Sequence, residues 1–301
     1  MPQPDLTDHF TELIRRASTV LPSDVGAAIR AAADHEDEGS VARRVLLSLL
    51  ENAAAAARES SPICQDTGTL TFHVTHDAGF SRAVLEDQIR EAVAEATRRS
   101  FLRPNAVNAL TGKNSGNNLG TGAPLVFFHD AFGRSEAADT QHSTLSATLL
   151  LKGGGSENVS IQYSLPDERL GAGRDYAGVR RCILDAVHRA QGYGCAPGTL
   201  GIGIGGDRMT SHMTAKEQLL RRLDDVNPDP DLAAHEKEAV EKLNTLGIGP
   251  MGFGGRTTVL GVKIGARHRV PASFFVSIAY MCWAFRRCTM TWKDGTASFE
   301  S

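Results

Sequence analysis

Three consecutive polar residues, Cys64, Gln65 and Asp66, carry a thiol, an amide and a carboxylate in a segment bounded by Pro62 and Gly68. Proline restricts its own φ and pushes the preceding residue towards an extended conformation, and glycine lets the chain turn where other residues would clash. A cysteine alone is most often a small buried hydrophobic residue. Three such groups in a turn bounded by proline and glycine instead indicate a functional site.

Two more cysteines lie in similar surroundings. Cys195 lies in a turn that contains Gly194 and Pro197, and Cys282 follows an apolar segment and precedes a pair of arginines. The chain contains five cysteines, an odd number that is widely spread, so the pattern does not predict a disulfide framework.

Three kinds of chemistry use thiols in such turns. Zinc sites commonly use paired cysteines two residues apart, and this spacing is absent here. A thiol nucleophile needs a histidine base, and nothing in the sequence ties Cys64 to a particular histidine. Thiolates also bind iron–sulfur clusters, and three protein ligands would leave one iron with an open position that acts as a Lewis acid on a substrate oxygen. Spacing alone leaves all three open.

A glycine-rich segment, an arginine and a long loop add polar candidates. Residues 152–158 read Lys-Gly-Gly-Gly-Ser-Glu-Asn after an apolar strand pattern. Glycine N–H groups approach a ligand closely and suit anions, so we expect anion binding here, with a flexible hairpin as the alternative. Arg103, next to Pro104, is also well placed for an anion. Residues 111–124 are either a flexible linker or an ordered polar loop.

Helices and strands must position these groups. Apolar residues recur at helical spacing in residues 5–59 and alternate from Leu70, so the Cys64 turn is predicted to connect a helix to a strand. The sequence therefore predicts a mixed α/β (α+β) fold with a helical N-terminal part, residues 1–60. Further helices are expected at 81–101, 175–191, 211–223 and 231–245, and further strands at 125–128, 144–151, 200–206, 257–264 and 274–280.

A glycine pattern in the 200–206 strand resembles a dinucleotide fingerprint. Gly201, Gly203 and Gly206 have the G-x-G-x-x-G spacing, and Asp224 lies at a fitting distance along the chain. The glycines lie within the expected strand, however, whereas the fingerprint follows a strand. We therefore reject a dinucleotide site.

Composition excludes several classes of protein. The chain has 301 residues, 41% of them hydrophobic, and a net charge of −3, which gives no basic footprint for nucleic acid. No apolar run approaches the roughly 20 residues that span a bilayer, and the N-terminal segment lacks the features of a signal peptide. We expect a cytoplasmic globular protein that binds neither nucleic acid nor a membrane.

Five motifs follow one another along the chain: Cys64-Gln-Asp-Thr-Gly, Lys152-Gly-Gly-Gly-Ser-Glu-Asn, Cys195-Ala-Pro-Gly with the Gly-Ile-Gly-Ile-Gly-Gly that follows, Leu246-Gly-Ile-Gly and Cys282-Trp-Ala-x-Arg-Arg. Taken together and in this order, they resemble the class I fumarase and L-tartrate dehydratase family. The resemblance runs from about residue 40 to nearly the end, and the chain is similar to the α subunit or to the N-terminal domain of fused forms. One difference is Ala196, where the family commonly has proline in Cys-Pro-Pro.

The resemblance implies reversible hydration of a dicarboxylic acid at a [4Fe–4S] cluster with one open iron. It implies that Cys64, Cys195 and Cys282 bind the cluster, and that Cys182 and Cys288 do not. The form of the glycine motif is closer to the fumarase branch, so we expect fumarate and malate as substrates. The alternatives are an L-tartrate or other hydroxy-diacid dehydratase, and a non-catalytic cluster-binding partner protein.

The resemblance also implies the residues around the substrate. Arg103 would pair with a carboxylate, because its planar guanidinium matches one with two hydrogen bonds. The candidates for catalysis are Asp66, Arg103 and His268, and the candidates for substrate binding are Gln65, Asp66, Arg103, Gly154, Gly155 and Asn158.

His268, in a cationic turn, is the only candidate here for moving the proton. Residues 1–301 read as one catalytic domain of the α-subunit type, and the last cysteine motif lies close to Ser301. By resemblance, the remaining site residues belong to a separate β subunit of roughly 200 residues, in an α2β2 or similar assembly.

Overall fold

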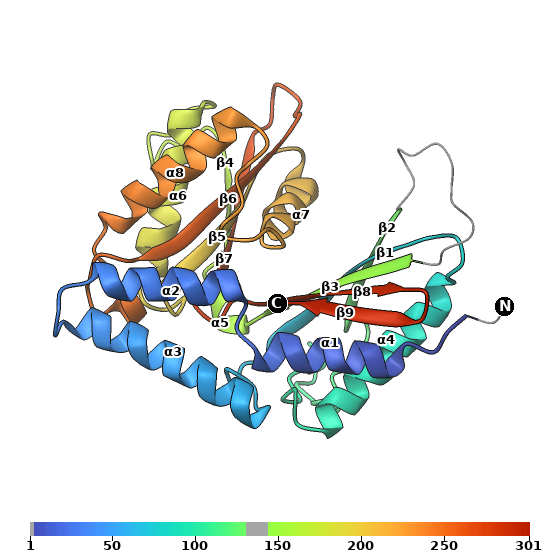
Figure 1. The fold of residues 1–301 in the computed structure, drawn as a ribbon. Coiled ribbons are helices and arrows are strands. Elements are labelled where there is room, and N and C mark those ends of the chain that lie inside the picture. The colour runs from blue at the N-terminus through green and yellow to red at the C-terminus, as the bar shows by residue number, and fades with distance from the viewer. Residues whose placement is uncertain (1–2, 131–143) are drawn as a thin grey trace. The chain divides into compact units, whose positions relative to one another are not determined.

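The computed structural model describes residues 3–130 and 144–301, which form two compact units (Figure 1). The first unit comprises Met1–Pro22, Asn52–Lys152 and Arg286–Ser301, and the second comprises Ser23–Glu51 and Gly153–Phe285. The boundary between them runs through helix α3 (Val41–Glu59). The single catalytic domain expected for residues 1–301 stays a prediction, and each unit within it has its own core.

The first unit is a five-stranded sheet with helices α1 and α4 packed on it. Its strands lie in the order β2-β1-β3-β8-β9, in which β1 and β2 are parallel and the other neighbours antiparallel. The elements are α1 (Thr7–Thr19), β1 (Thr69–His76), α4 (Arg82–Arg98), β2 (Leu125–Asp130), β3 (Thr144–Lys152), β8 (Arg286–Lys293) and β9 (Thr296–Glu300).

Alternation along β1 explains why this sheet has one apolar face. Leu70, Phe72 and Val74 are buried, whereas the residues between them stay half-buried. The ring of Phe10, from α1, meets that of Phe72 edge to face at 6.4 Å between centroids. The helix at 81–101 and the strands beginning near Leu70, 125 and 144 are thus confirmed.

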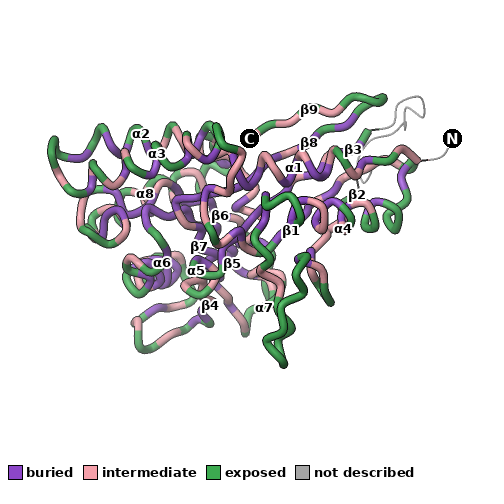
Figure 2. Tube along the Cα trace, turned by 90° about the horizontal axis from the view of Figure 1, so that it is seen from below, coloured by how far each residue is buried: buried purple, intermediate pink, exposed green. Residues whose placement is uncertain are grey.

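The second unit is built on a four-stranded sheet in the order β4-β7-β5-β6. Strands β5 and β6 are parallel, and β7 runs antiparallel to both β5 and β4. The strands at its centre are buried (Figure 2). The elements are α2 (Ser23–His35), α5 (Gly154–Asn158), β4 (Ile161–Ser164), α6 (Tyr176–Ala190), β5 (Gly198–Gly205), α7 (Arg208–Gln218), α8 (Pro230–Asn244), the 3₁₀ turn η1 (Pro250–Gly252), β6 (Val259–Arg267) and β7 (Phe275–Met281).

Glycines in β5 let α7 approach the sheet closely. A Cβ on Gly201 would lie 2.1 Å from the carbonyl oxygen of Ala215, and one on Gly203 would lie 2.0 Å from that of Ser211. The first two glycines of the G-x-G-x-x-G spacing therefore have a packing role, which agrees with the rejection of a dinucleotide fingerprint.

The mixed α/β fold expected from the sequence is confirmed, with helices over residues 7–19, 23–35 and 41–59 before the first strand. None of the helices that the structure describes is both long and apolar enough to cross a bilayer.

Candidate functional site

The Cys64 turn is held through its backbone on both sides. Before it, the amide of Ile63 donates to the carbonyl of Ser18 at 3.0 Å, and the Asn52 side chain donates to the carbonyl of Ile63 at 2.9 Å. After it, the guanidinium of Arg286, only 1% exposed, donates to the carbonyl of Asp66 at 2.7 Å. These bonds fix the turn and leave the Cys64 thiol half-exposed.

Arg103 lies beside this turn. Its Nη1 donates to Gln65 Oε1 at 3.4 Å. Buried Thr67 ties the two segments together, because its Oγ1 accepts from the Arg103 amide at 3.2 Å and from the Asn105 side chain at 3.0 Å. The structure thus brings Gln65 and Arg103 together on a fixed backbone.

Asn118 is a positioning residue that the sequence did not single out. Its side chain is 3% exposed and donates to the Arg103 carbonyl at 2.9 Å. Its Oδ1 accepts from the amides of Asn105 and Ala106 at 2.7 and 3.1 Å. These bonds favour the ordered polar loop over the flexible linker for residues 111–124. In the sequence, the only signal for Asn118 was its place in a run of Thr, Asn and Gly residues.

Cys195 occupies a strained backbone position in the second unit. Its φ is +53°, a left-handed conformation that a non-glycine residue adopts at a cost. Its amide donates to the carbonyl of Gly192 at 3.0 Å, and the next carbonyl, of Ala196, accepts from the amide of Met251 at 2.8 Å. The turn holds the thiol exposed to solvent.

Strand pairing brings Cys195 and Cys282 to the same end of one sheet. Because β7 runs antiparallel to β5, Met281 at the end of β7 pairs with Thr199 near the start of β5. The amide of Trp283 then donates to the carbonyl of Cys195 at 3.1 Å. Two of the three cysteines predicted as cluster ligands therefore lie in adjoining turns, and neither is in a disulfide.

Tyr280 lies beneath these two turns. Its ring is 1% exposed, and a Cβ on Gly194 or Gly198 would lie 2.5 or 2.3 Å from it. Burial, and next the neighbouring Cys282 and Cys195, raise the pKa of its hydroxyl. That hydroxyl is buried without a hydrogen-bond partner in residues 3–130 and 144–301. A buried hydroxyl without a hydrogen-bond partner beside two cysteine turns fits a site for a bound group.

The glycine-rich segment forms helix α5, not the hairpin considered as an alternative. Ser160, just after the helix, accepts from the Tyr280 amide at 3.1 Å through its Oγ. Glu157 pairs with Lys216 of α7 at 2.6 Å. The segment that carries Gly154, Gly155 and Asn158 therefore packs beside the strand that leads to Cys282, and a Cβ on Gly155 would meet only open space.

His268 lies at the opposite end of the second sheet. It follows β6, whose last residue, Arg267, pairs with Gly205 at the end of β5, whereas Cys195 precedes β5. A strand rises about 3.3 Å per residue, so the eight residues of β5 separate the two ends by roughly 25 Å. The structure does not bring His268 together with the Cys195 and Cys282 turns.

The predicted site residues thus form two groups. Cys64, Gln65, Asp66 and Arg103 belong to the first unit, and Asp66 and Arg103 lie on the two segments that Thr67 joins. Those of the second unit are Gly154, Gly155, Asn158, Cys195 and Cys282, with His268 apart from them.

Comparison with known proteins agrees with these features. The family model for fumarate hydratase (Fumerase) matches residues 7–291. A putative class I fumarate hydratase of Geobacillus stearothermophilus is 50% identical over 285 residues, which are 94% of this chain and 54% of that protein. The chain thus spans about half the length of that relative.

Two proteins named as L(+)-tartrate dehydratase alpha subunits are also similar to this chain. The putative L(+)-tartrate dehydratase subunit alpha of Methanocaldococcus jannaschii is 33% identical over 94% of this chain and 95% of its own. The L(+)-tartrate dehydratase subunit alpha of Escherichia coli K12 is 30% identical over 95% of this chain and 89% of its own. By the match to its family model and by these identities, the chain belongs to the fumarate hydratase family.

Proposed function

We propose that this chain is the cluster-binding part of an iron–sulfur hydro-lyase that interconverts fumarate and malate. The observation that carries the proposal is the meeting of the Cys195 and Cys282 turns at one end of the second sheet. The name of the relative with 50% identity, a putative class I fumarate hydratase, supports fumarate as the substrate.

We assign a [4Fe–4S] cluster to Cys64, Cys195 and Cys282, as the family resemblance implies, and the chemistry of these donors suits it. None of the three is in a disulfide and none is fully buried, whereas Cys182 and Cys288 are buried in the cores. Thiolates are the usual protein ligands of such clusters. When bound, a cluster with three protein ligands supplies an iron with an open position, which acts as a Lewis acid on a substrate oxygen.

The chain's own residues bind and orient the diacid. Arg103 holds one carboxylate through its planar guanidinium, and Gln65 Oε1, 3.4 Å from Nη1, limits the directions in which that guanidinium can turn. Asp66 contacts the substrate from a backbone that buried Arg286 fixes. By the family resemblance, backbone N–H groups at Gly154 and Gly155 and the Asn158 side chain would contribute to the anion pocket.

A partner subunit completes the enzyme in this proposal. Dehydration next to a carboxylate needs a group that moves a proton. His268 lies roughly 25 Å along the sheet from the Cys195 end, so we assign that group to a separate β subunit of roughly 200 residues, in an α2β2 or similar assembly. The two relatives named as alpha subunits, of which the chain covers 95% and 89%, support a separate partner.

L-tartrate dehydration is the second candidate. Both relatives named as L(+)-tartrate dehydratase alpha subunits align over most of their length. A malate and a tartrate differ by one hydroxyl group, so the same arginine and glycines suit either diacid. A non-catalytic cluster-binding role is the third, and the joined Gln65–Arg103 pair argues for a substrate site.

Anaerobic reconstitution tests these assignments. The full chain should bind about four irons and four sulfides and absorb visible light, and single Cys→Ser changes at positions 64, 195 and 282 should each remove this absorption. Cys182→Ala and Cys288→Ala, which change buried core residues, serve as matched controls and should keep it. A cluster that survives Cys195→Ser or Cys282→Ser would contradict the assignment.

Activity identifies the substrate and the partner. The reconstituted chain, alone and with a candidate β subunit, is assayed anaerobically with fumarate, malate, L-tartrate and mesaconate. We expect turnover of fumarate and malate only in the presence of the partner. Full turnover by the chain alone would place the proton-transfer group within these 301 residues.

A further inference from the structure

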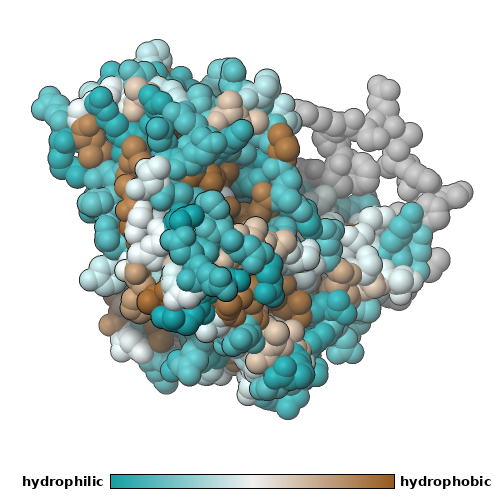
Figure 3. Space-filling view, turned by 60° about the vertical axis from the view of Figure 1, so that its left-hand side comes forward, coloured by the Kyte–Doolittle hydropathy of each residue, from teal (hydrophilic) through white to brown (hydrophobic). Residues whose placement is uncertain are grey.

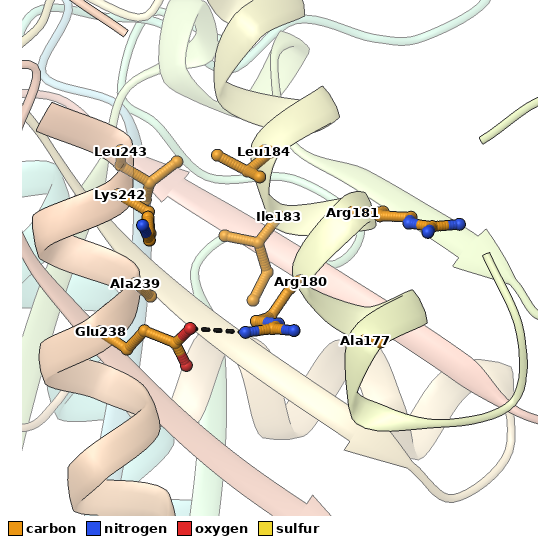
Figure 4. Close-up of a pocket in the computed structure, with 9 residues that line it drawn as sticks. All are labelled: Ala177, Arg180, Arg181, Ile183, Leu184, Glu238, Ala239, Lys242 and Leu243. Atoms are coloured by element: carbon orange, nitrogen blue, oxygen red, sulfur yellow. Dashed lines mark hydrogen bonds and ion pairs between the residues drawn. The ribbon is translucent and has the colours of Figure 1, made fainter. Parts of the chain in front are cut away.

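A pocket of about 260 Å³ lies between helices α6 and α8, apart from the proposed site residues (Figure 4). On each helix, the residues that face the pocket are three or four positions apart along the chain, which places them on one face of that helix. The residues that line it are Ala177, Arg180, Arg181, Ile183, Leu184, Glu238, Ala239, Lys242 and Leu243.

The lining is apolar in the middle and charged at its ends. Ile183 and Leu184 project from α6 towards Leu243 on α8 (Figure 4). Figure 3, which brings forward the side of Figure 1 that carries these helices, shows hydrophobic surface exposed among hydrophilic side chains. At one end, Arg180 pairs with Glu238 at 2.6 Å and closes the gap between the helices. A ligand with an apolar body fits such a lining.

Two polar groups around the pocket lack partners. The exposed Lys242 ammonium makes no ion pair or hydrogen bond with any residue that the structure describes. Near the end that the Arg180–Glu238 pair closes, the Tyr176 hydroxyl is buried without a hydrogen-bond partner in the described part of the chain, and the Arg180 guanidinium carbon lies 5.8 Å from the Tyr176 ring centroid. Of these two groups, Lys242 lines the pocket and favours an anion.

Both helices lead into the loops that hold Cys195. Helix α6 ends five residues before it, and the loop after α8 contains Met251, whose amide donates to the Ala196 carbonyl at 2.8 Å. A Cβ on Gly192 would lie 2.7 Å from the Met251 carbonyl oxygen, so the two loops are in direct contact. A ligand that fixes the spacing of α6 and α8 therefore also restrains the Cys195 turn.

We propose that the pocket between α6 and α8 binds a small carboxylic acid with an apolar body, whose carboxylate pairs with Lys242, and that this ligand stabilises the turn at Cys195. The pocket would thus bind a short-chain or aromatic monocarboxylate, which differs from the hydrophilic diacid of the proposed reaction. The pocket is an effector site for the cluster-binding end of the second sheet.

Calorimetric titration of the full chain with phenylacetate tests the site. A ligand of this size should bind with a Kd of about 1 mM, and uncharged phenylacetamide should bind at least about tenfold more weakly because it cannot pair with Lys242. Sodium sulfate, an anion without an apolar body, should show no saturable heat. Equal binding of acid and amide, or no saturable binding of phenylacetate, would overturn the site.

Variants locate the binding. Lys242→Met keeps the apolar stem and should weaken phenylacetate about tenfold, and Ala239→Leu should fill the cavity and abolish binding. Lys237→Met, an exposed change on the same helix outside the pocket, is the matched control and should bind normally. Circular dichroism verifies that each variant is folded. Loss of binding in Lys237→Met, or normal binding in folded Ala239→Leu, would overturn the location.

Hydrogen exchange tests the coupling without any activity measurement. Saturating phenylacetate should slow exchange at least twofold in residues 191–197 and 246–252, which include the hydrogen-bonded amides of Cys195 and Met251. Ala239→Leu should show no such ligand effect. Slower exchange confined to α6 and α8 would overturn the link to Cys195.

Discussion

Replacement of Asn118 by alanine should remove the hydrogen bonds that hold the backbone around Arg103, while Arg103 itself stays unchanged. Asn118 accepts from the amides of Asn105 and Ala106 and donates to the carbonyl of Arg103, with a further bond to Thr97 Oγ1 at 2.9 Å. Because the side chain is 3% exposed, water cannot replace these bonds in the folded state. The variant therefore leaves backbone groups of the Arg103 segment without partners.

The expected cost follows from four hydrogen bonds and one backbone angle. A typical intramolecular hydrogen bond contributes about 1 kcal/mol net, so losing four costs about 3–4 kcal/mol if no group finds another partner. Asn118 also has a φ of +61°, which asparagine tolerates better than alanine, and this adds about 1 kcal/mol. Asn118→Asp keeps Oδ1 as an acceptor but places a buried carboxylate oxygen 2.9 Å from the Arg103 carbonyl oxygen, so it should cost at least as much as Asn118→Ala.

Urea denaturation of the full chain measures this cost, with Asn117→Ala as the matched control. Asn117 is exposed and accepts one bond, from the Leu119 amide at 3.1 Å, so its replacement should lower the free energy of unfolding by less than about 1 kcal/mol. Under the proposed function, the folded Asn118→Ala chain assayed with its β subunit should show a higher KM for the diacid, while the cluster absorption stays. An Asn118→Ala variant as stable as Asn117→Ala, with normal KM, would refute the positioning role.

Three more predictions follow from single positions. Cys195→Gly should raise the free energy of unfolding by about 0.5–1 kcal/mol in urea denaturation, because glycine relieves the strain at φ +53°, yet it should abolish cluster absorption; lower stability would contradict the strain. Arg103→Lys should lower kcat/KM by the equivalent of about 2–4 kcal/mol and leave the cluster intact, and near-normal kcat/KM would remove Arg103 from the site. Burial, and next His129, lower the pKa of His73 to about 4. As the pH falls, the unfolded chain protonates this histidine below about pH 6.5, whereas the folded chain does so only near pH 4. The free energy of unfolding, measured in urea, should therefore fall by up to about 2 kcal/mol between pH 6.5 and pH 4, and by less in His73→Gln. The same pH dependence in His73→Gln and the parent chain would contradict this role of His73.

The sequence predicted the elements better than the contacts between them. The Cys64 turn does connect helix α3 to strand β1, because its flanking periodicity and its proline and glycine are local signals. The hydrogen bond from buried Arg286 to Asp66 spans 220 positions, and nothing near either residue indicates it. Helix α5 was missed for a similar reason. Its glycines favour a loop, and the bond from the Tyr280 amide to Ser160 Oγ acts from a distant strand.

The difference from the family motif at Ala196 is explained by the same reliance on the backbone. Ala196 is fully buried, and its carbonyl oxygen accepts from the Met251 amide at 2.8 Å. Cys195 likewise presents its carbonyl to the Trp283 amide at 3.1 Å. Proline and alanine both carry a carbonyl group, so the bond that joins the Cys195 turn to η1 does not depend on which of them stands at position 196. The cysteine turns therefore depend on the conformation of the main chain. Glycines, residues with a left-handed backbone conformation and buried side chains that donate to carbonyl groups maintain that conformation.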